Sequence, residues 1–386
     1  MTPAARVQAA IEILDRVVAG EPTEKALTQW ARSHRFAGSK DRAAIRDHVF
    51  DAVRCKNSYA KAGGGLNGRG LMLGGLRLGG IDAATLFDGS TYGPHPLTVE
   101  ETAYFAPAYS DDIAVDLQDW VWEKFQADLG DQALPTANAL RERASVFLRV
   151  NTRKGDLASA QSALAAEDIE TVPSDLSPTA LLVTSNPRRV AASKAFQDGL
   201  VELQDAASQA VCDFVRLDGA QTLLDYCAGG GGKTLALAAR SRAKFVAHDA
   251  DFNRMGDLPQ RAKRAGVTVQ LRRSIDDSER FDLVLCDVPC SGSGSWRRSP
   301  DGKWALTPQR LAELIEIQRE ILRKTAPLVA SGGVLAYATC SVFASENNEQ
   351  IESFLAENPD WKLEDAHQFL PQAGGDGFYI ATLTHA

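Results

Sequence analysis

The sequence predicts an α/β protein whose largest part is a doubly wound parallel sheet. Between residues 222 and 339, short apolar segments alternate with helical patterns, which is the order typical of parallel sheets. The run Gly229–Gly232 joins the first of these segments to its helix, and glycine lets a backbone approach a ligand closely. Two later apolar segments end next to cysteines, at the edge where such sheets bind ligands.

The whole chain has the composition of an ordinary globular protein. It has 386 residues, enough for two or three domains, with 44% hydrophobic and 24% charged residues. No apolar run reaches the roughly 18 residues that a membrane helix needs. The net charge of −8 argues against a surface that is basic throughout. We expect a cytoplasmic monomer that does not associate with membranes.

The six cysteines favour free thiols over zinc ligands or disulfides. None of them shows the paired spacing of a zinc site, and their density is far below that of a small disulfide scaffold. We therefore expect no metal.

Residues 1–110 are expected to be helical. Apolar residues recur at helical spacing over residues 3–19, with Thr2 as the N-cap and Pro3 as the first helical residue. Similar patterns continue to residue 53, and glycines then interrupt them between residues 63 and 80.

Residues 111–200 are expected to form a further helix and a small α/β module. The helix is predicted over residues 112–129. The module has three predicted strands, at residues 146–150, 170–172 and 180–184, and one helix, at residues 157–166.

Residues 201–386 are expected to hold the doubly wound domain. Its predicted strands are 222–226, 244–248, 267–271, 281–287 and 334–339. Helices are predicted at 233–240, 253–265, 307–330 and 345–357, and a closing strand begins within residues 374–379. For the third of these helices, Gly332 and Gly333 are the expected stop.

The glycine loop predicts a nucleoside-bearing cofactor. Asp249, at the end of the next strand, suits the hydroxyls of a ribose. A triphosphate loop would need glycine where Cys227 stands, so that alternative fails on spacing. A dinucleotide fits the loop, but no hydride-transfer partner follows. S-adenosylmethionine needs only close backbone approach and acids, which Asp225, Asp249 and Asp287 supply.

Asp287, Cys290 and Cys340 form a set suited to methylating carbon 5 of a pyrimidine. That carbon is a poor nucleophile until a thiolate adds to carbon 6, and a nearby acid and a base then complete the reaction. The residue types alone do not say which thiol attacks. Cys227 is expected to line the site without reacting, and three other cysteines are expected to be buried small hydrophobic residues, namely Cys55, Cys212 and Cys286.

Five segments resemble, in order, the motifs of the RsmB/Sun family of RNA cytosine-5 methyltransferases. They read DYCAGGGGKT, DVPCSGSG, RRSPDGKW, YATCSVFASENNEQI and GGDGFYI, within a resemblance that covers about residues 112–386. The resemblance implies a Rossmann-like S-adenosylmethionine methyltransferase domain preceded by a small α/β module. It also implies an N-terminal domain like the NusB-like helical domain of the family, with a role in RNA binding.

The resemblance also implies roles for individual residues. Cys340 is the nucleophile, Cys290 assists breakdown of the adduct, and Asp287 contacts both cofactor and base. The implied cofactor residues are Cys227, Ala228, Gly229, Gly230, Gly231, Gly232, Lys233, Asp249, Asp276 and Asp287, with Asp277 as an alternative to Asp276.

Two positions depart from the pattern of this family. Gly229-Gly230 replace the usual Ala-Pro, which loosens the turn, and Arg261 stands where asparagine is usual.

The segment after the reactive loop predicts contact with RNA. Arg297, Arg298, Lys303 and Trp304 place cations among aromatic rings, a combination suited to phosphates and unpaired bases. We expect a methyltransferase that forms 5-methylcytosine at an unpaired position in RNA, ribosomal rather than transfer RNA. The alternative is an RNA-binding ribosome-assembly factor that has the methyltransferase fold but little or no turnover.

Overall fold

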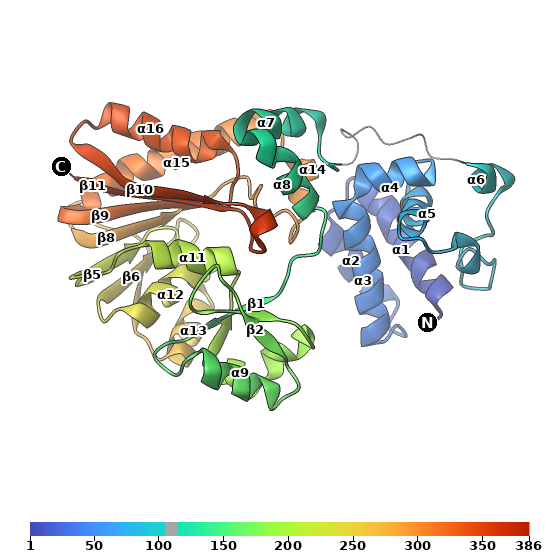
Figure 1. Cartoon of the computed structure of the whole chain (residues 1–386), viewed down its shortest axis with the longest axis horizontal. Helices are drawn as coiled ribbons and strands as arrows, with labels where there is room; N and C mark the ends of the chain where they lie inside the picture. The colour runs from blue at the N-terminus through green and yellow to red at the C-terminus, as the bar shows by residue number, and fades with distance from the viewer. Residues whose placement is uncertain (105–114, 386) are drawn as a thin grey trace. The chain divides into compact units, whose positions relative to one another are not determined.

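The computed structural model describes residues 1–104 and 115–385, which form two compact units (Figure 1). The first unit comprises the described residues up to Arg143 together with the segment Trp296–Ala305. The second comprises Ala144–Ser295 and the described residues from Leu306 onward. None of the described helices is long and apolar enough to cross a membrane.

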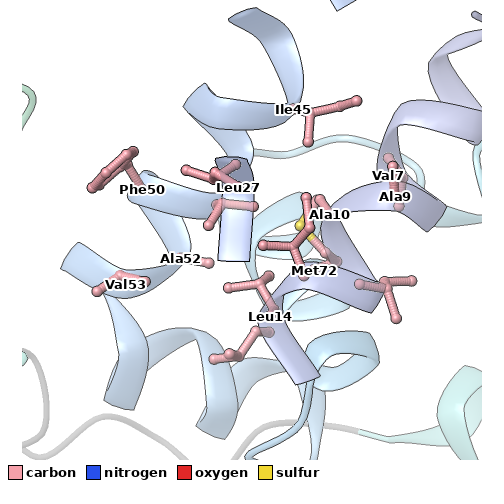
Figure 2. Packing of buried hydrophobic residues seen from close by; sticks show 14 of the residues in the cluster. Val7, Ala9, Ala10, Leu14, Leu27, Ile45, Phe50, Ala52, Val53 and Met72 are labelled. Atoms are coloured by element: carbon pink, nitrogen blue, oxygen red, sulfur yellow. The ribbon is translucent and has the colours of Figure 1, made fainter. Parts of the chain in front are cut away.

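The first unit is helical, as expected. Thr2 caps the first helix, because its side-chain oxygen accepts a hydrogen bond from the Ala5 amide at 3.2 Å. The α-helices of the first unit are α1 (Pro3–Val18), α2 (Thr23–Ser33), α3 (Ser39–Arg54), α4 (Lys56–Gly63), α5 (Gly68–Leu78), α6 (Val99–Ala103), α7 (Asp119–Leu129), α8 (Ala133–Ala139) and α14 (Asp301–Ala305). Figure 2 shows buried side chains of α1, α2, α3 and α5 that pack into one core, among them Leu14, Leu27, Ile45 and Met72.

The glycines between residues 63 and 80 allow helices to touch instead of breaking them. A Cβ atom on Gly63 would lie 1.8 Å from the carbonyl oxygen of Gly70, and one on Gly74 would lie 1.9 Å from that of Tyr59. A Cβ atom on Gly68 would lie 2.1 Å from the carbonyl oxygen of Ile11. Glycine is therefore required where α5 meets α4 and α1, at contacts too close for any side chain.

The helix predicted over residues 112–129 is shorter in the structure. It begins at Asp119, and residues 112–114 lie outside the described part of the chain. Asp116 has a φ of 51°, a left-handed conformation that a right-handed helix cannot include. Its buried carboxylate accepts hydrogen bonds from the amide and hydroxyl of Ser58, at 2.8 and 2.6 Å, and pairs with Arg141 at 2.8 Å. These contacts outweigh the helical pattern.

The segment Trp296–Ala305 is held by the end of α3. The indole Nε1 of Trp304 donates to the carbonyl oxygen of Val53 at 2.7 Å, and Lys303 Nζ donates to that of Arg54 at 2.5 Å. In return, Arg54 Nε donates to the carbonyl oxygen of Arg297 at 2.8 Å.

The second unit contains two sheets. The smaller has four antiparallel strands in the order β2-β3-β1-β4. Three of them are the predicted strands of the small α/β module, and β4, beyond residue 200, was not predicted. The elements of this module are β1 (Phe147–Val150), α9 (Leu157–Ala165), β2 (Thr171–Pro173), β3 (Ala180–Val183), α10 (Lys194–Gln197) and β4 (Val201–Leu203).

The larger sheet has seven strands in the order β10-β11-β9-β8-β5-β6-β7. Its five strands β5 to β9 run parallel, so the doubly wound prediction is confirmed for them, whereas β10 and β11 are antiparallel. The strands are β5 (Thr222–Asp225), β6 (Lys244–His248), β7 (Val269–Arg272), β8 (Phe281–Asp287), β9 (Val329–Thr339), β10 (Trp361–Phe369) and β11 (Phe378–His385).

Helices cover both faces of the larger sheet (Figure 1). Successive residues of β5 point to opposite faces, so Leu223 packs under α11 and α12, whereas Leu224 packs under α15 and α16. The helices of this domain are α11 (Ala206–Phe214), α12 (Gly232–Arg240), α13 (Leu258–Ala265), α15 (Pro308–Thr325) and α16 (Asn348–Glu357).

Two predictions about the end of the chain were wrong. The helix expected to reach residue 330 ends at Thr325, because Pro327 follows in a 3-10 turn and β9 begins at Val329. Gly332 therefore lies inside a strand and does not stop a helix. The edge strand β10 was missed because most of its residues are exposed and polar, which hides the apolar pattern of a strand.

We predict that Gly74→Ala destabilises the protein by at least about 2 kcal/mol, since the added Cβ has no room beside the backbone of Tyr59. Denaturant unfolding measures this loss. Gly38→Ala is the matched control, because a Cβ at Gly38 meets only the Asp41 side chain, at 3.6 Å. Equal stability of both variants would contradict the packing described for α5.

Candidate active site

The carboxyl ends of β5, β6, β8 and β9 meet beside a cavity of about 620 Å³. Loops that follow parallel strands gather at one edge of the sheet, and this is where the sequence placed the cofactor and the reactive thiols. The cavity is lined by Gln204, Ser208, Cys227, Ala228, Gly229, Gly230, Gly232, Lys233, Arg254, Arg261, Asp287, Val288, Pro289, Cys290, Arg310, Leu314 and Cys340.

The glycine loop takes a shape that only glycine permits. Gly229 and Gly231 have φ angles of 50° and 77°, and Gly231 is the N-cap of α12. A Cβ atom on Gly231 would lie 2.2 Å from Leu258 Cδ1, so α13 packs directly against the turn. The loop thus presents backbone, without side chains, to the cavity.

Two arginines hold the loop from outside. Arg149, on β1, donates to the carbonyl oxygen of Gly232 at 2.8 Å. Arg261, on α13, donates to the carbonyl oxygen of Gly230, and a Cβ atom on Gly230 would lie 2.9 Å from Arg261 Nη1. A side chain at position 230 and the guanidinium of Arg261 therefore compete for the same space. Arg261 therefore fixes the turn at Gly230, the position at which the family usually has a stiffer proline.

Asp249 also holds the loop. Its carboxylate accepts the Gly229 amide at 2.9 Å and pairs with Arg254 at 3.1 Å, and the residue is only 3% exposed. Asp249 lies where the sequence predicts it, at the end of β6, but it is not among the residues that line the cavity. The guanidinium of Arg254, which does line the cavity, lies between this acid and solvent.

Asp225 lies buried beneath the loop. Burial raises the pKa of this carboxyl group to about 7, although a hydrogen bond of 2.5 Å from the Thr234 hydroxyl opposes the shift. Among the described residues, its second oxygen, Oδ1, has no hydrogen-bond partner. A buried acceptor next to the loop suits a ligand that carries donors, such as an amino group or hydroxyls.

Lys233 and Asp287 form an ion pair in the cavity wall. Lys233 Nζ donates to Asp287 Oδ2 at 2.8 Å. Burial disfavours the ammonium, but the neighbouring carboxylate outweighs burial, and the pKa of Lys233 is raised. The contact with Asp287 therefore favours the charged form of Lys233.

Cys290 and Cys340 lie in contact beside this ion pair. Their sulfur atoms are 3.3 Å apart, although the two residues follow different strands. The hydrogen bond from the Cys290 thiol lowers the pKa of Cys340, and both Lys233 and a hydrogen bond from Ser295 act in the same direction. The same thiol-thiol bond raises the pKa of Cys290 well above its usual range, with burial and the charge of Glu346 adding to it. Of the two thiols, Cys340 is therefore the one that loses its proton at the lower pH.

A buried carboxylate, Glu346, ties the two cysteine loops together. It is fully buried and accepts the Ser291 amide at 2.8 Å, the Ser341 hydroxyl at 2.6 Å and Gln318 Nε2 at 3.0 Å. Ser291 directly follows Cys290, and Ser341 directly follows Cys340. The carboxylate therefore fixes the separation of the two sulfur atoms.

The other cysteines lie as the sequence predicted. Cys227 lines the cavity, and burial raises its pKa well above the usual range. Burial also raises the pKa values of the remaining three, to about 11 for Cys55 and about 12 for Cys212 and Cys286. These thiols stay protonated and unreactive.

Asp276 does not join the site. It follows β7 as expected, but it is exposed, and its carboxylate accepts hydrogen bonds from Ser278 instead of facing the cavity. The alternative, Asp277, is also exposed and is absent from the cavity lining. The structure therefore does not support a cofactor role for the acid expected after the third strand.

The cations predicted to contact RNA are mostly turned inward. Lys303 is fully buried and Arg297 is 4% exposed, while the indole of Trp304 is half-buried against α3. Burial lowers the pKa of Lys303 to about 8. Of the four residues only Arg298 is exposed. The interleaved cations and rings anchor the segment inside the first unit, so the predicted RNA contact by Arg297 and Lys303 is corrected.

Sequence reasoning missed several residues of this site. Glu346 lies inside a segment that resembled the family, but nothing in its spacing showed that a charged residue would be buried. Arg254 and Arg310 line the cavity from helical segments whose patterns indicated only solvent-exposed cations. A charged residue six positions after the cysteine that follows a buried strand is a signal that could have pointed to Glu346.

Two family descriptions match this chain. "16S rRNA methyltransferase RsmB/F" matches residues 214–384, and a ferredoxin-like domain of RsmF/B-like methyltransferases matches residues 118–190.

Curated relatives and a solved structure agree with these families. The chain is 34% identical over 280 residues to a ribosomal RNA small subunit methyltransferase B of Citrobacter koseri, covering 68% of this chain and 65% of the relative. It is 36% identical to the protein of that name in Xylella fastidiosa, covering 68% of this chain and 66% of the relative. The chain thus spans slightly less than two thirds of these relatives. The crystal structure of PH0851 has a TM-score of 0.77 at 24% identity, covering 100% of this chain and 99% of that one, which shows the fold.

We predict that Cys340 reacts with iodoacetamide at lower pH than an ordinary cysteine, because its lowered pKa makes thiolate available there. Lys233→Met removes a cation that favours the thiolate, so the inflection of the rate–pH profile should move upward. Mass spectrometry of the labelled peptide follows the reaction at Cys340 alone. Lys244→Met, at an exposed position, is the control. An unchanged inflection in Lys233→Met would contradict the electrostatic role of Lys233.

We predict that Glu346→Ala lowers the free energy of unfolding by about 3 kcal/mol, since several buried donors lose their acceptor. The loosened loops should also slow alkylation of Cys340 at a given pH, because the thiol partner is no longer fixed. Glu349→Ala, at an exposed position on α16, should leave both properties within error of the unmodified protein. A stability loss below about 1 kcal/mol in Glu346→Ala would overturn this view of the network.

Proposed function

Because the chain belongs to the RsmB/Sun family of methyltransferases, we propose that it methylates carbon 5 of a cytosine in ribosomal RNA. The observation that carries this proposal is the contact between Cys290 and Cys340, 3.3 Å apart at the rim of one cavity with Asp287. Simple methyl transfer to an oxygen or nitrogen atom needs no thiol. A covalent route to carbon 5 requires a thiolate that attacks the ring and a second group that removes a proton, and two thiols with pKa values shifted in opposite directions suit these roles.

The residues of the cavity are suited to each step of that route. The Cys340 thiolate adds to carbon 6 of the ring, which makes carbon 5 nucleophilic, and carbon 5 then accepts a methyl group. We assign to Asp287, in its protonated form, a hydrogen bond donated to nitrogen 3, where negative charge develops as the thiolate adds. A base then removes the proton from carbon 5, the electron pair restores the ring double bond, and the bond from Cys340 to carbon 6 breaks. Cys290, once deprotonated, is our candidate for this base.

The protonation states of the thiols agree with this order. The lowered pKa of Cys340 and the raised pKa of Cys290 describe the enzyme before attack. Once the Cys340 sulfur is bonded to carbon, it carries no negative charge and no longer raises the pKa of Cys290. Cys290 can then lose its proton more easily, at the stage where a base is needed.

S-adenosylmethionine is the cofactor, and its bound sulfonium supplies an electrophilic methyl group. The cavity fits this group, because the loop Gly229–Gly232 admits close backbone approach. Asp225 does not line the cavity but lies buried beneath this loop with an unpartnered oxygen. Asp287 would offer a carboxyl oxygen to the bound cofactor, and Lys233 holds that carboxyl group in place. Arg254 pairs with Asp249, so a ribose that bonds to Asp249 has to share or displace this cation.

The substrate proposal comes from the relatives. Those named above are ribosomal RNA small subunit methyltransferases, and the base has to leave a helix to reach the thiolate. An unpaired cytosine in ribosomal RNA that is not fully assembled meets this requirement. The cytoplasmic location and the monomeric state expected from the sequence stay predictions.

We predict that the purified protein transfers tritium from methyl-labelled S-adenosylmethionine to ribosomal RNA, and that Cys340→Ala reduces the rate by at least about a thousandfold, since the covalent route is lost. Bisulfite sequencing of the product RNA should show protection at a cytosine. Cys286→Ala, at a buried cysteine outside the cavity, is the control. An assembly factor with little turnover would instead bind cofactor and RNA without transferring tritium.

We also predict that Cys290→Ala accumulates a protein–RNA adduct that survives a denaturing gel, because release of the base needs Cys290. The double variant Cys290→Ala, Cys340→Ala should form none. Rapid turnover by Cys290→Ala without an adduct would contradict the release role.

A further inference from the structure

The first unit carries two aromatic side chains that are unusually exposed. Phe36 lies in the connection between α2 and α3 and is 74% exposed, and Tyr92 is 77% exposed. Large aromatic residues are usually buried, because covering them with protein releases water from an apolar surface. Exposed aromatic rings that share one surface therefore point to a ligand.

Phe36 and Tyr92 line the same cavity. Its volume is about 500 Å³, within the roughly 300–1,000 Å³ range of ligand sites, and Trp30 and His34 contribute further rings. Trp30 and His34 are stacked, with ring centroids 4.3 Å apart, and Phe36 meets the edge of His34 at 5.8 Å. The rest of the lining comes mainly from the start of α1. The cavity is therefore walled by flat π surfaces that a planar ring could join.

A buried donor adds to this cavity. Trp30 is 5% exposed, and among the described residues its indole Nε1 has no hydrogen-bond partner. The other tryptophan of this unit discussed above, Trp304, donates its indole hydrogen to a carbonyl oxygen. An unpaired donor costs free energy that a polar ligand could recover if the cavity opened to reach it.

Cationic side chains lie close to Phe36 in the sequence, although the charged residue that lines the cavity itself is Glu12. Arg32, Arg35 and Lys40 flank Phe36 in the sequence and are exposed, and within the described part of the chain they form no ion pair. The protein as a whole has a net charge of −8, whereas residues 31–40 hold these three cations and no acidic residue. Flat rings with adjacent cations are the combination that binds single-stranded nucleic acid.

We propose that this surface, defined by His34, Phe36, Tyr92, Arg32, Arg35 and Lys40, binds an unpaired segment of the RNA substrate. Bases stack on Phe36 and Tyr92, and the three cations contact phosphates on the same strand. This inference rests on the proposed function for the identity of the RNA, but its binding chemistry belongs to this surface. It replaces the contact that the sequence had assigned to Arg297 and Lys303.

Single-stranded RNA fits these observations better than the other partners that carry negative charge. A membrane surface would select the cations but offers no planar ring for the aromatic cavity. A duplex hides its bases and shows only phosphates and groove edges. An acidic protein segment would pair with the cations without requiring two stacking rings.

The test is RNA binding by the full-length protein, measured by fluorescence anisotropy with a labelled unpaired oligonucleotide. Phe36→Ala with Tyr92→Ala should weaken binding about tenfold or more, through loss of stacking. Arg32→Glu with Arg35→Glu should also weaken binding and should flatten its dependence on salt concentration. Val99→Ala, an 80% exposed apolar residue of the same unit, and Lys362→Glu, an exposed cation of the other unit, are the controls.

Kinetics separate this surface from the catalytic site. In the aromatic double variant, KM for RNA should rise, while kcat at saturating RNA and the Kd for S-adenosylmethionine should stay within about twofold of the unmodified protein. Far-ultraviolet circular dichroism and an unchanged Tm establish that the variant is folded.

The outcomes are distinct. RNA affinity and KM within twofold of the unmodified protein in both double variants would overturn the proposal, as would equal loss of binding to a duplex of the same sequence. If the unmodified protein binds RNA through this surface but transfers no methyl group, the proposed function fails and the surface stands. If methylation proceeds and the variants are unaffected, the surface fails and the proposed function stands.

Discussion

The contact between the sulfur atoms of Cys290 and Cys340 is the constraint on which the rest of the site depends. The two residues follow different strands, and their loops are joined directly, since the Gly294 amide donates to the carbonyl oxygen of Cys340 at 3.0 Å. Glu346 joins them further, since one buried carboxylate accepts hydrogen bonds from the residues that follow each cysteine. A carboxylate is costly to bury, and here it is stabilised by donors that would otherwise be unpaired. The catalytic geometry is therefore built into the packing of the domain.

Electrostatics turns this contact into a functional asymmetry. Two identical thiols at 3.3 Å would share one titration, but their surroundings differ. Lys233 and Ser295 favour the thiolate of Cys340, whereas Glu346 disfavours that of Cys290. The acids at the strand ends form ion pairs with cations: Asp287 pairs with Lys233, and Asp249 pairs with Arg254. A sulfonium that enters this cavity therefore meets acids whose positions are already fixed by protein cations.

Much of this arrangement could be predicted from the sequence, because it depends on strand ends. The alternation of apolar segments and helices located β5, β6, β8 and β9, and parallel strands bring their carboxyl ends together whatever the details of packing. Asp287, Cys290, Cys340 and the glycine loop follow directly from that topology. The burial of Cys212 and Cys286 follows from their positions within apolar patterns.

What the sequence could not predict depends on contacts between distant segments. From the sequence, Lys303 resembles an RNA ligand. In the structure its ammonium donates a hydrogen bond to the carbonyl oxygen of Arg54 in α3, 249 positions away in sequence. From the sequence, the glycines of α5 resemble interruptions of a helix, whereas in the structure they leave room for the backbones of α4 and α1. Asp276 follows β7 at the distance expected for a cofactor-binding acid, but its carboxylate accepts hydrogen bonds from Ser278 in a local turn. In each of these cases the local pattern is compatible with two outcomes, and a partner far along the chain decides between them.

The central claim is that the thiolate of Cys340, and no other, bonds to the cytosine ring. RNA in which the target cytosine carries fluorine at carbon 5 tests this claim most directly, because the adduct cannot be released when no proton can leave that carbon. Digestion of the trapped complex and mass spectrometry identify the modified peptide. The account predicts that the nucleotide is attached to Cys340, and attachment to Cys290, or methylated product without any attachment, would contradict it.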